Sequence, residues 1–232
     1  MHIPRNATIQ IEGLKDSKQI REESARERIF DELMLLEKIK WSTVLVSPQR
    51  IDELNIQESI LQGMSEACSI MTSRVDSNMT RAVSGIKEFH YDDKGIYFVS
   101  NCDQETNISN AYALIDGNQV PKSISCEAEA ITGGDGSEAC IAAASIISKV
   151  TLDRIMNEYA MEHHNYNFNT NKGYKTLSHV KAIRTWGCLQ IHRKTFDPIK
   201  FMSFDEHGKL VSEKSWKRGR MKVKQRRSER NK

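Results

Sequence analysis

Hydrophobic positions along the chain follow two spacings, one typical of helices and one typical of strands. Apolar residues recur every three or four positions in four segments, which we predict to be helices: residues 18–40, 52–71, 138–162 and 175–186. Short apolar runs bounded by turn residues predict four strands: residues 41–47, 95–100, 111–115 and 125–131. Strands alternating with helices define the α/β class.

The run at 111–115 is continuously apolar, which is typical of a strand buried on both faces of a parallel sheet. We predict that it is a central strand. The helix at 138–162 carries Ala142, Ala143 and Ser145 close together, and small side chains let a helix lie close to a sheet. We therefore predict that this helix packs on the central strand through these residues. After Phe196 the apolar pattern fades, and no further element is expected.

The length of 232 residues predicts one domain with an appendage. We place the domain at 1–200, with a polar insertion around 72–110, and a basic, disordered tail at 201–232. Residues 214–232 hold ten Lys or Arg against one Glu, a balance of +9, so the rest of the chain carries −6 of the net +3. The tail either attracts a polyanion such as a nucleic acid or is simply solvated.

Several classes of protein are excluded by what the sequence lacks. No apolar run approaches the roughly 18 residues that span a bilayer, and Met1 is followed by no apolar signal region. The five cysteines show no paired spacing and the seven histidines no zinc pattern. We predict a cytoplasmic protein with reduced thiols, or a nuclear or organellar one in a eukaryote, with no membrane contact.

Two acids stand where candidate strands end. Asp116 follows the run at 111–115, and Asp135 lies in a glycine-rich turn after the run at 125–131. Ligands gather at the carboxyl ends of strands in open α/β sheets, and paired carboxylates favour a divalent-metal site. Ordinary turn chemistry is the alternative for both residues. A phosphate-binding loop is excluded for the turn, because no Lys-Ser or Lys-Thr follows at the required spacing.

The order of six motifs resembles that of the type II ribonuclease H family. The motifs are GLKDSK (13–18), IDELNI (51–56), LIDGN (114–118), GGDGSEACIAAASIISKV (133–150), KGYKTLSH (172–179) and GCLQIHRKTF (187–196). Each is modest evidence alone, and their shared order and spacing is strong evidence. The resemblance implies a ribonuclease-H-like mixed sheet flanked by helices.

The resemblance also implies a function. The family hydrolyses RNA paired to DNA, including ribonucleotides embedded in DNA, with two divalent metals, Mg²⁺ or Mn²⁺, held by four carboxylates. It makes Asp116 and Asp135 catalytic metal ligands and Tyr174, Lys172 and Lys149 substrate-binding residues. From the residues alone, Tyr174 can equally be a core tyrosine, and Lys149 can be solvated or structural. We expect a monomer whose partner is an RNA–DNA hybrid or ribonucleotide-containing DNA.

The family's opening motifs, Asp-Glu and then Gly-Arg-Gly-Pro, occur nowhere in this sequence. They supply two of the four carboxylates and part of the grip on the ribonucleotide, and their strand is the first of the sheet. We therefore expect the first strand to be missing and the shortened chain to be weakly active or inactive. A late start codon is the explanation we favour over a split gene or a degenerate copy. The alternative function is a non-catalytic nucleic-acid-binding module.

Overall fold

The computed structural model describes residues 1–4, 11–14, 20, 22–72, 92, 95–102, 108 and 110–214. The chain forms two compact units, Met1–Ile155 and Met156–Lys232. Most of the predicted insertion and residues 215–232 of the predicted tail lie outside the described residues, so the expected disorder of residues 215–232 is untested. The domain limits 1–200 and 201–232 remain a prediction.

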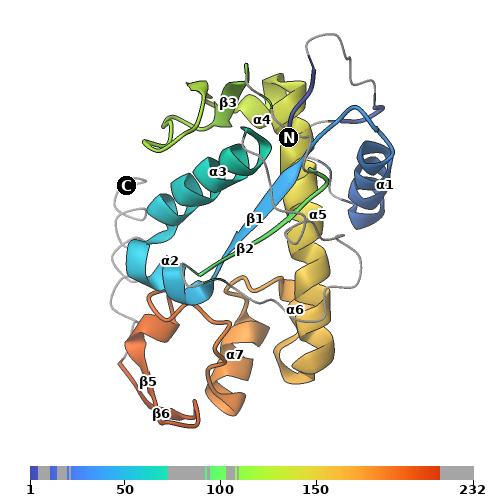
Figure 1. Ribbon diagram of the computed structural model, residues 1–232. Coiled ribbons are helices and arrows are strands. Elements are labelled where there is room, and N and C mark those ends of the chain that lie inside the picture. The colour runs from blue at the N-terminus through green and yellow to red at the C-terminus, as the bar shows by residue number, and fades with distance from the viewer. Residues whose placement is uncertain are drawn as a thin grey trace, which may run out of the picture. The chain divides into compact units, whose positions relative to one another are not determined.

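Helices occur together with short strands, which confirms the predicted α/β class (Figure 1). The helices are α1 (Glu23–Met34), α2 (Pro48–Leu54), α3 (Ile56–Thr72), α4 (Gly134–Ser137), α5 (Ala139–Glu162), α6 (Phe168–Asn171) and α7 (Leu177–Trp186), with 3-10 turns η2 (His164–Tyr166) and η3 (Ile199–Phe201). The strands are β1 (Ser42–Val46), β2 (Ile96–Ser100), β3 (Tyr112–Asp116), β4 (Glu127–Ile131), β5 (Met202–Phe204) and β6 (Leu210–Glu213). In the described residues the strands pair two by two, β1 with β2, β3 with β4 and β5 with β6.

The core of the first unit joins α5, α1 and the antiparallel pair β1–β2 (Figure 1). Its buried residues are Ile29, Phe30, Leu33, Trp41, Tyr97, Val99, Ala143, Ile146, Ile147 and Val150. Ala142 and Ala143 are buried, so the small-residue face of α5 packs inward as predicted. This cluster contains no residue of the run at 111–115, so packing of α5 on that run remains a prediction.

Asn55 divides the segment predicted as one helix at 52–71 into two. Its backbone takes a positive φ of 77°, which ends α2, and its N–H donates to the Ile51 carbonyl. Its side-chain Oδ1 accepts from the N–H groups of Gln57 and Glu58 at 3.0 and 3.2 Å, which caps the start of α3. Asn is a strong N-cap residue, and this capping supports Asn55 in a backbone conformation, φ 77° and ψ 164°, that glycine adopts more readily.

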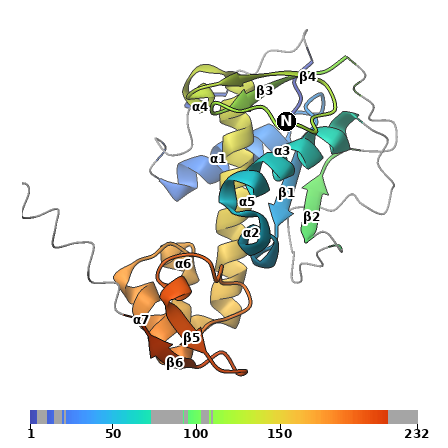
Figure 2. The same cartoon turned by 90° about the vertical axis from the view of Figure 1, so that its left-hand side faces the viewer.

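The parallel pair β3–β4 differs from the predicted central strand. Its register runs from Tyr112 opposite Glu127 to Asp116 opposite Ile131, and Figure 2 shows the two strands side by side near α4. Because β3 has a single partner in the described residues, each strand is an edge strand there. Tyr112 is 51% exposed, and only Ile115 of β3 is buried, so the prediction of burial on both faces is wrong.

The second unit has its own core. Its buried members are Met156, Tyr166, Phe168, Ala182, Ile183, Ile199 and Met202. The predicted helix at 175–186 is confirmed as α7, which starts two residues later because the Thr176 hydroxyl caps it by accepting from the His179 N–H. The antiparallel hairpin β5–β6 lies where no element was predicted. Its strands are too short for an apolar pattern, and the Asp205 carboxylate organises the turn by accepting from the His207 and Lys209 N–H groups.

Replacing Gly187 by Ala should destabilise the second unit by about 2–4 kcal/mol. Gly187 caps α7 with φ 99° and ψ −169°, a region that only glycine adopts readily. A Cβ there would lie 2.3 Å from the Gly208 carbonyl oxygen, which is backbone and cannot swing away. Urea unfolding measures the loss. Gly136→Ala is the control, because nothing lies within 4 Å of its Cβ position. Equal stability of the two variants would contradict this prediction.

All five cysteines lie among the described residues and none forms a disulfide, and the Cys68 and Cys126 sulfurs approach to 3.5 Å. Burial, followed by the Cys68 thiol, raises the pKa of Cys126 to about 11, so this thiol is a weak nucleophile at neutral pH. None of the described helices combines the length and the apolar character that crossing a membrane requires.

Candidate active site

Asp116 and Asp135 lie together at the carboxyl ends of β3 and β4. Asp116 is the last residue of β3, and its Oδ1 accepts a hydrogen bond from the Gly134 N–H at 3.0 Å. Asp135 is the next residue, in the first turn of α4. This hydrogen bond holds the Asp116 carboxylate against the turn that carries Asp135, so the structure brings the two predicted metal ligands to one end of the strand pair.

Glycines make this close approach feasible. Gly133 precedes α4 with a positive φ of 70°, which permits the sharp turn out of β4. Gly134 is buried, and a Cβ there would lie 2.4 Å from Cδ1 of Ile141 and 3.4 Å from Cβ of Ile131. The Gly117 N–H donates to the Ile131 carbonyl at 3.0 Å, which ties the two turns together just beyond the strands.

The pair fits part of a divalent-metal site. Carboxylate oxygens are the ligands that Mg²⁺ and Mn²⁺ prefer. Among the described residues no three His, Cys, Asp or Glu side chains gather in a group that could hold a metal ion. Asp116 and Asp135 can therefore supply part of a coordination shell, and their role as metal ligands remains a prediction.

Lys149 lies in an ion pair that the sequence analysis did not identify. Its Nζ is 2.7 Å from Oδ1 of Asp153, one turn further along α5, and Arg26 of α1 approaches the other oxygen at 3.4 Å. Asp153 is 2% exposed. The i,i+4 spacing of Lys149 and Asp153 is the sequence pattern that could have predicted this ion pair. This contact gives Lys149 a structural role, and its predicted contact with substrate remains a prediction.

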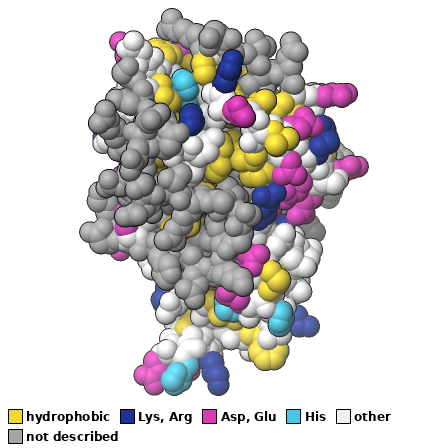
Figure 3. Space-filling view, turned by 45° about the vertical axis from the view of Figure 1, so that its right-hand side comes forward, with side chains coloured by type: hydrophobic (Ala, Val, Ile, Leu, Met, Phe, Trp, Pro, Cys, Tyr) yellow, Lys and Arg dark blue, Asp and Glu magenta, His cyan; other side chains and the backbone are white. Residues whose placement is uncertain are grey.

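Arg154, the next residue along α5, also contacts α1. Its guanidinium lies over the Phe30 ring, 4.4 Å from the centroid, and pairs with Glu27 and Asp31. In Figure 3, acidic and basic side chains lie beside one another on the described part of the face shown. The contacts with Phe30, Glu27 and Asp31 give Arg154 a structural role.

Tyr174 and Lys172 belong to the second unit. The Tyr174 side chain is 65% exposed, so the interpretation as a core tyrosine is wrong. The Lys172 Nζ donates to Oδ1 of Asn157 at 2.7 Å. Lys172 and Gly173 both have positive φ, 48° and 77°, and form a tight turn that presents the tyrosine. A shared cleft of Tyr174 with Asp116 and Asp135 remains a prediction.

Asn171, which directly precedes Lys172, organises the same turn. Its side chain is buried, and Nδ2 donates to the Tyr166 carbonyl at 2.6 Å while Oδ1 accepts from the Gly173 N–H at 2.8 Å. Both halves of the amide are therefore used. The Asn171 side chain therefore supports the turn from within.

Two buried histidines from separate motifs meet in the second unit. His179 of α7 and His192 are 4% and 7% exposed, and their Nε2 atoms lie 3.1 Å apart. Burial, with repulsion from His179 as the second cause, lowers the pKa of His192 to about 4, and burial also lowers the pKa of His179. No local spacing in the sequence pairs His192 with His179.

Stability should fall in acid because of His192. Its folded pKa of about 4 lies below the ordinary 6.5, so the unfolded chain binds more protons between these values. Its contribution is complete above pH 6.5, is lost as the pH falls toward 4, and amounts to on the order of 3 kcal/mol. Urea unfolding from pH 7.5 to 4.5 measures the slope. His192→Asn should flatten this slope, and exposed His207→Gln should not. Parallel slopes in all three proteins would contradict the prediction.

The fold and the acidic pair together define a class of protein. This is an α/β protein with carboxylates at the carboxyl ends of parallel strands, an arrangement in which ligand and cation sites form. The family model of ribonuclease HII matches residues 2–199. The chain belongs to the ribonuclease HII family, and this confirms both the resemblance and the ribonuclease-H-like fold class.

Individual relatives support the same assignment. The ribonuclease HII of Xanthomonas campestris pv. campestris (strain 8004) is 35% identical over 193 residues, which are 82% of this chain and 64% of that protein. Those of Marinomonas sp. (strain MWYL1) and Endomicrobium trichonymphae are 34% and 33% identical, over 82% and 85% of this chain and 77% and 75% of their own lengths. The chain thus spans less than two thirds of the length of the Xanthomonas relative.

Proposed function

We propose that the protein is an endonuclease that hydrolyses RNA paired to DNA, including single ribonucleotides embedded in DNA, with Mg²⁺ or Mn²⁺. The observation that carries the proposal is the Asp116 carboxylate held against the turn of Asp135 at the ends of two parallel strands. Family membership supports it, since the relatives are named ribonuclease HII. A cytoplasmic location and a monomeric state remain expectations.

The chain's own residues would act in three ways. Asp116 and Asp135 would hold divalent cations through their carboxylate oxygens, and the Gly134 N–H would fix the Asp116 oxygen that it contacts. A bound divalent cation supplies an activated water at neutral pH and stabilises charge on the leaving oxygen. The exposed Tyr174 ring would pack on the sugar at the cleavage site, where the 2′-hydroxyl distinguishes RNA from DNA. Lys172 and Lys149 would contact phosphates.

A non-catalytic nucleic-acid-binding module is the second candidate. It is favoured by the number of carboxylates, because the described residues gather no third metal-binding side chain at the pair. Two carboxylates hold two metal ions less firmly than four would. In this reading the Tyr174 turn and the basic residues at 214–232 bind a hybrid without cutting it.

Cleavage of labelled duplexes separates the candidates. The 232-residue polypeptide is compared with one extended by a segment containing Asp-Glu-x-Gly-Arg-Gly, on an RNA–DNA hybrid, on DNA with one ribonucleotide and on all-DNA. We expect the extended protein to cut the first two with Mg²⁺ or Mn²⁺, and neither in EDTA, and the 232-residue protein to cut weakly. Equal robust rates would show that the additional carboxylates are dispensable. Binding without cleavage by both proteins would favour the second candidate.

A further inference from the structure

The hydrogen bonds of His179 and His192 determine where their protons lie. Nδ1 of His179 is 3.0 Å from the Tyr174 carbonyl oxygen, which can only accept, so this nitrogen carries a proton. Nδ1 of His192 accepts from the Leu189 N–H at 2.9 Å, so this nitrogen carries none. The neutral His192 must then be protonated at Nε2, and it donates across 3.1 Å to Nε2 of His179. One arrangement of protons satisfies all three bonds.

An additional proton breaks this arrangement wherever it is placed. A proton on Nδ1 of His192 would face the Leu189 N–H. A proton on Nε2 of His179 would face the N–H of His192, unless His192 moved its own proton to Nδ1, which again faces Leu189. The geometry therefore requires both imidazoles to be neutral. The lowered pKa values of both rings agree with this requirement.

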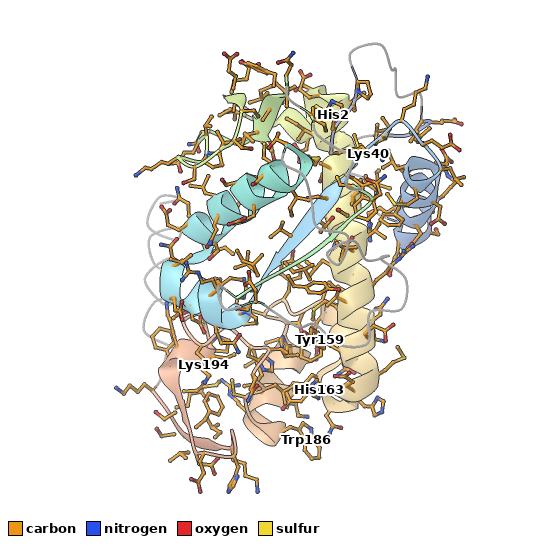
Figure 4. The ribbon with its side chains drawn as sticks, in the orientation of Figure 1. His2, Lys40, Tyr159, His163, Trp186 and Lys194 are labelled. Carbon is orange, nitrogen blue, oxygen red and sulfur yellow. The ribbon has the colours of Figure 1, made fainter. Side chains whose placement is uncertain are left out.

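The surroundings offer no compensating negative charge among the described residues that contact the pair. The Tyr166 and Phe168 rings pack on His192 at 5.4 and 5.8 Å between centroids, and Phe168 lies edge-on to His179 at 5.3 Å. The titratable groups that face the pair are Tyr166 itself, Cys188 beside Tyr166, and His163, which lies near Tyr159 on the last turns of α5 (Figure 4). None of these groups is a carboxylate.

The chain of hydrogen bonds through His192 and His179 ends at the backbone carbonyl of Tyr174. The Tyr174 carbonyl accepts from both the His179 ring and the Thr176 N–H, at 3.0 and 2.8 Å. The Tyr174 N–H donates to the Asn171 carbonyl at 2.8 Å. Both polar groups of the Tyr174 backbone are thus hydrogen-bonded, while the residue as a whole is 65% exposed. Because the backbone of Tyr174 is already ordered, little conformational entropy is lost there when a ligand binds.

We propose that the neutral His179–His192 pair positions Tyr174 for ribonucleotide binding, through the hydrogen bond from Nδ1 of His179 to the Tyr174 carbonyl. The two histidines are positioning residues and contact no substrate. The inference rests on the proposed function, because it takes Tyr174 as the residue that packs on the sugar. The two motifs that contain His179 and His192 then both serve the ribonucleotide site, through the single hydrogen bond from His179 to the Tyr174 carbonyl.

The proton arrangement can be tested in the 232-residue protein without substrate. Long-range ¹H–¹⁵N NMR of histidine-labelled protein should show the Nδ1–H form at His179 and the Nε2–H form at His192. Neither signal should titrate between pH 8 and 6. Titration of either buried imidazole in this range, or the reverse pair of tautomers, would overturn the inference.

The positioning role can be tested with a matched pair of variants. The amide nitrogen of Asn can take the place of Nδ1, so His179→Asn can keep the bond to Tyr174 and loses the bond to His192. The amide of Gln reaches the place of Nε2, so His179→Gln keeps the bond to His192 and loses the bond to Tyr174. Affinity for DNA with one ribonucleotide is measured against all-DNA in EDTA, where no metal-dependent cleavage occurs.

Tyr174→Ala and His179→Gln should each weaken ribonucleotide-dependent binding about tenfold, the effect of losing one aromatic stacking contact. His179→Asn should retain most of the affinity, and His179→Gln/Tyr174→Ala should bind no more weakly than Tyr174→Ala. A loss in Tyr174→Ala without a loss in His179→Gln, or additive losses, would overturn the positioning inference alone. Unchanged affinity in Tyr174→Ala would instead overturn the proposed role of Tyr174 itself.

Discussion

Replacing Asp116 by Asn should lower kcat/KM for a ribonucleotide-containing duplex by about a thousandfold or more, because a lost metal ligand removes several kcal/mol of transition-state stabilisation. Asp135→Asn should do the same. The fold should survive, since the Asn oxygen can still accept the Gly134 N–H that Asp116 accepts at 3.0 Å. The measurement is steady-state cleavage with Mg²⁺ by the protein extended with the Asp-Glu segment, with circular dichroism as the check on folding.

Glu127→Gln is the matched control for this experiment. Glu127 is an exposed carboxylate at the start of β4, at the far end of the strand from Asp116 and Asp135. The substitution removes the same charge from the same strand pair, so it separates loss of a ligand from a change in net charge. Near-normal cleavage by Asp116→Asn, or an equal loss in Glu127→Gln, would remove the basis for assigning the metal to this pair.

Replacing Asp153 by Ala should cost about 3–5 kcal/mol of unfolding free energy, the usual effect of breaking a buried ion pair. Asp153 is 2% exposed and contacts Lys149 at 2.7 Å and Arg26 at 3.4 Å. Without it, two cations remain close together, and Arg26, whose side chain is 11% exposed, loses a counter-charge in a partly buried setting. Urea unfolding followed by far-UV circular dichroism measures the change.

The same two helices provide a control for this prediction. Asp31 of α1 lies 3.6 Å from Arg154 of α5, and its side chain is 70% exposed. Solvent screens this pair, so Asp31→Ala should cost less than about 1 kcal/mol. Comparable losses in Asp31→Ala and Asp153→Ala would show that burial does not decide the strength of these contacts.

The sequence predicted elements well where the residues of one segment carry the signal. The helix at 138–162 has a sustained apolar period and appears as α5, and Gly187 ends α7 as a glycine cap should. The prediction failed at Asn55, where one polar residue ends a helix and starts another within a continuous apolar period. It also failed at β5–β6, whose three- and four-residue strands are too short to show alternation.

Contacts between distant segments were harder to predict. The acids at 116 and 135 could be paired from sequence, because parallel strands place their carboxyl ends at one edge. The His179–His192 contact could not, because it depends on how a loop returns to α7 and no local spacing encodes that path. Likewise Arg26 and Asp153 meet only because α1 and α5 share a core, and nothing in either helix specifies its partner.

The register of β3 and β4 determines where this family can tolerate insertions and deletions. Strand pairing aligns Asp116 with Ile131 whatever the length of the connection at 118–126, so residues can be gained or lost there without separating the acids. Between Ile131 and Asp135 the situation is the opposite, because the Gly134 N–H already reaches the Asp116 carboxylate. One residue added in that short turn would displace Asp135 from its partner. We therefore expect relatives to differ in length in the connection that precedes β4, and to keep a constant length between the end of β4 and the residue that corresponds to Asp135.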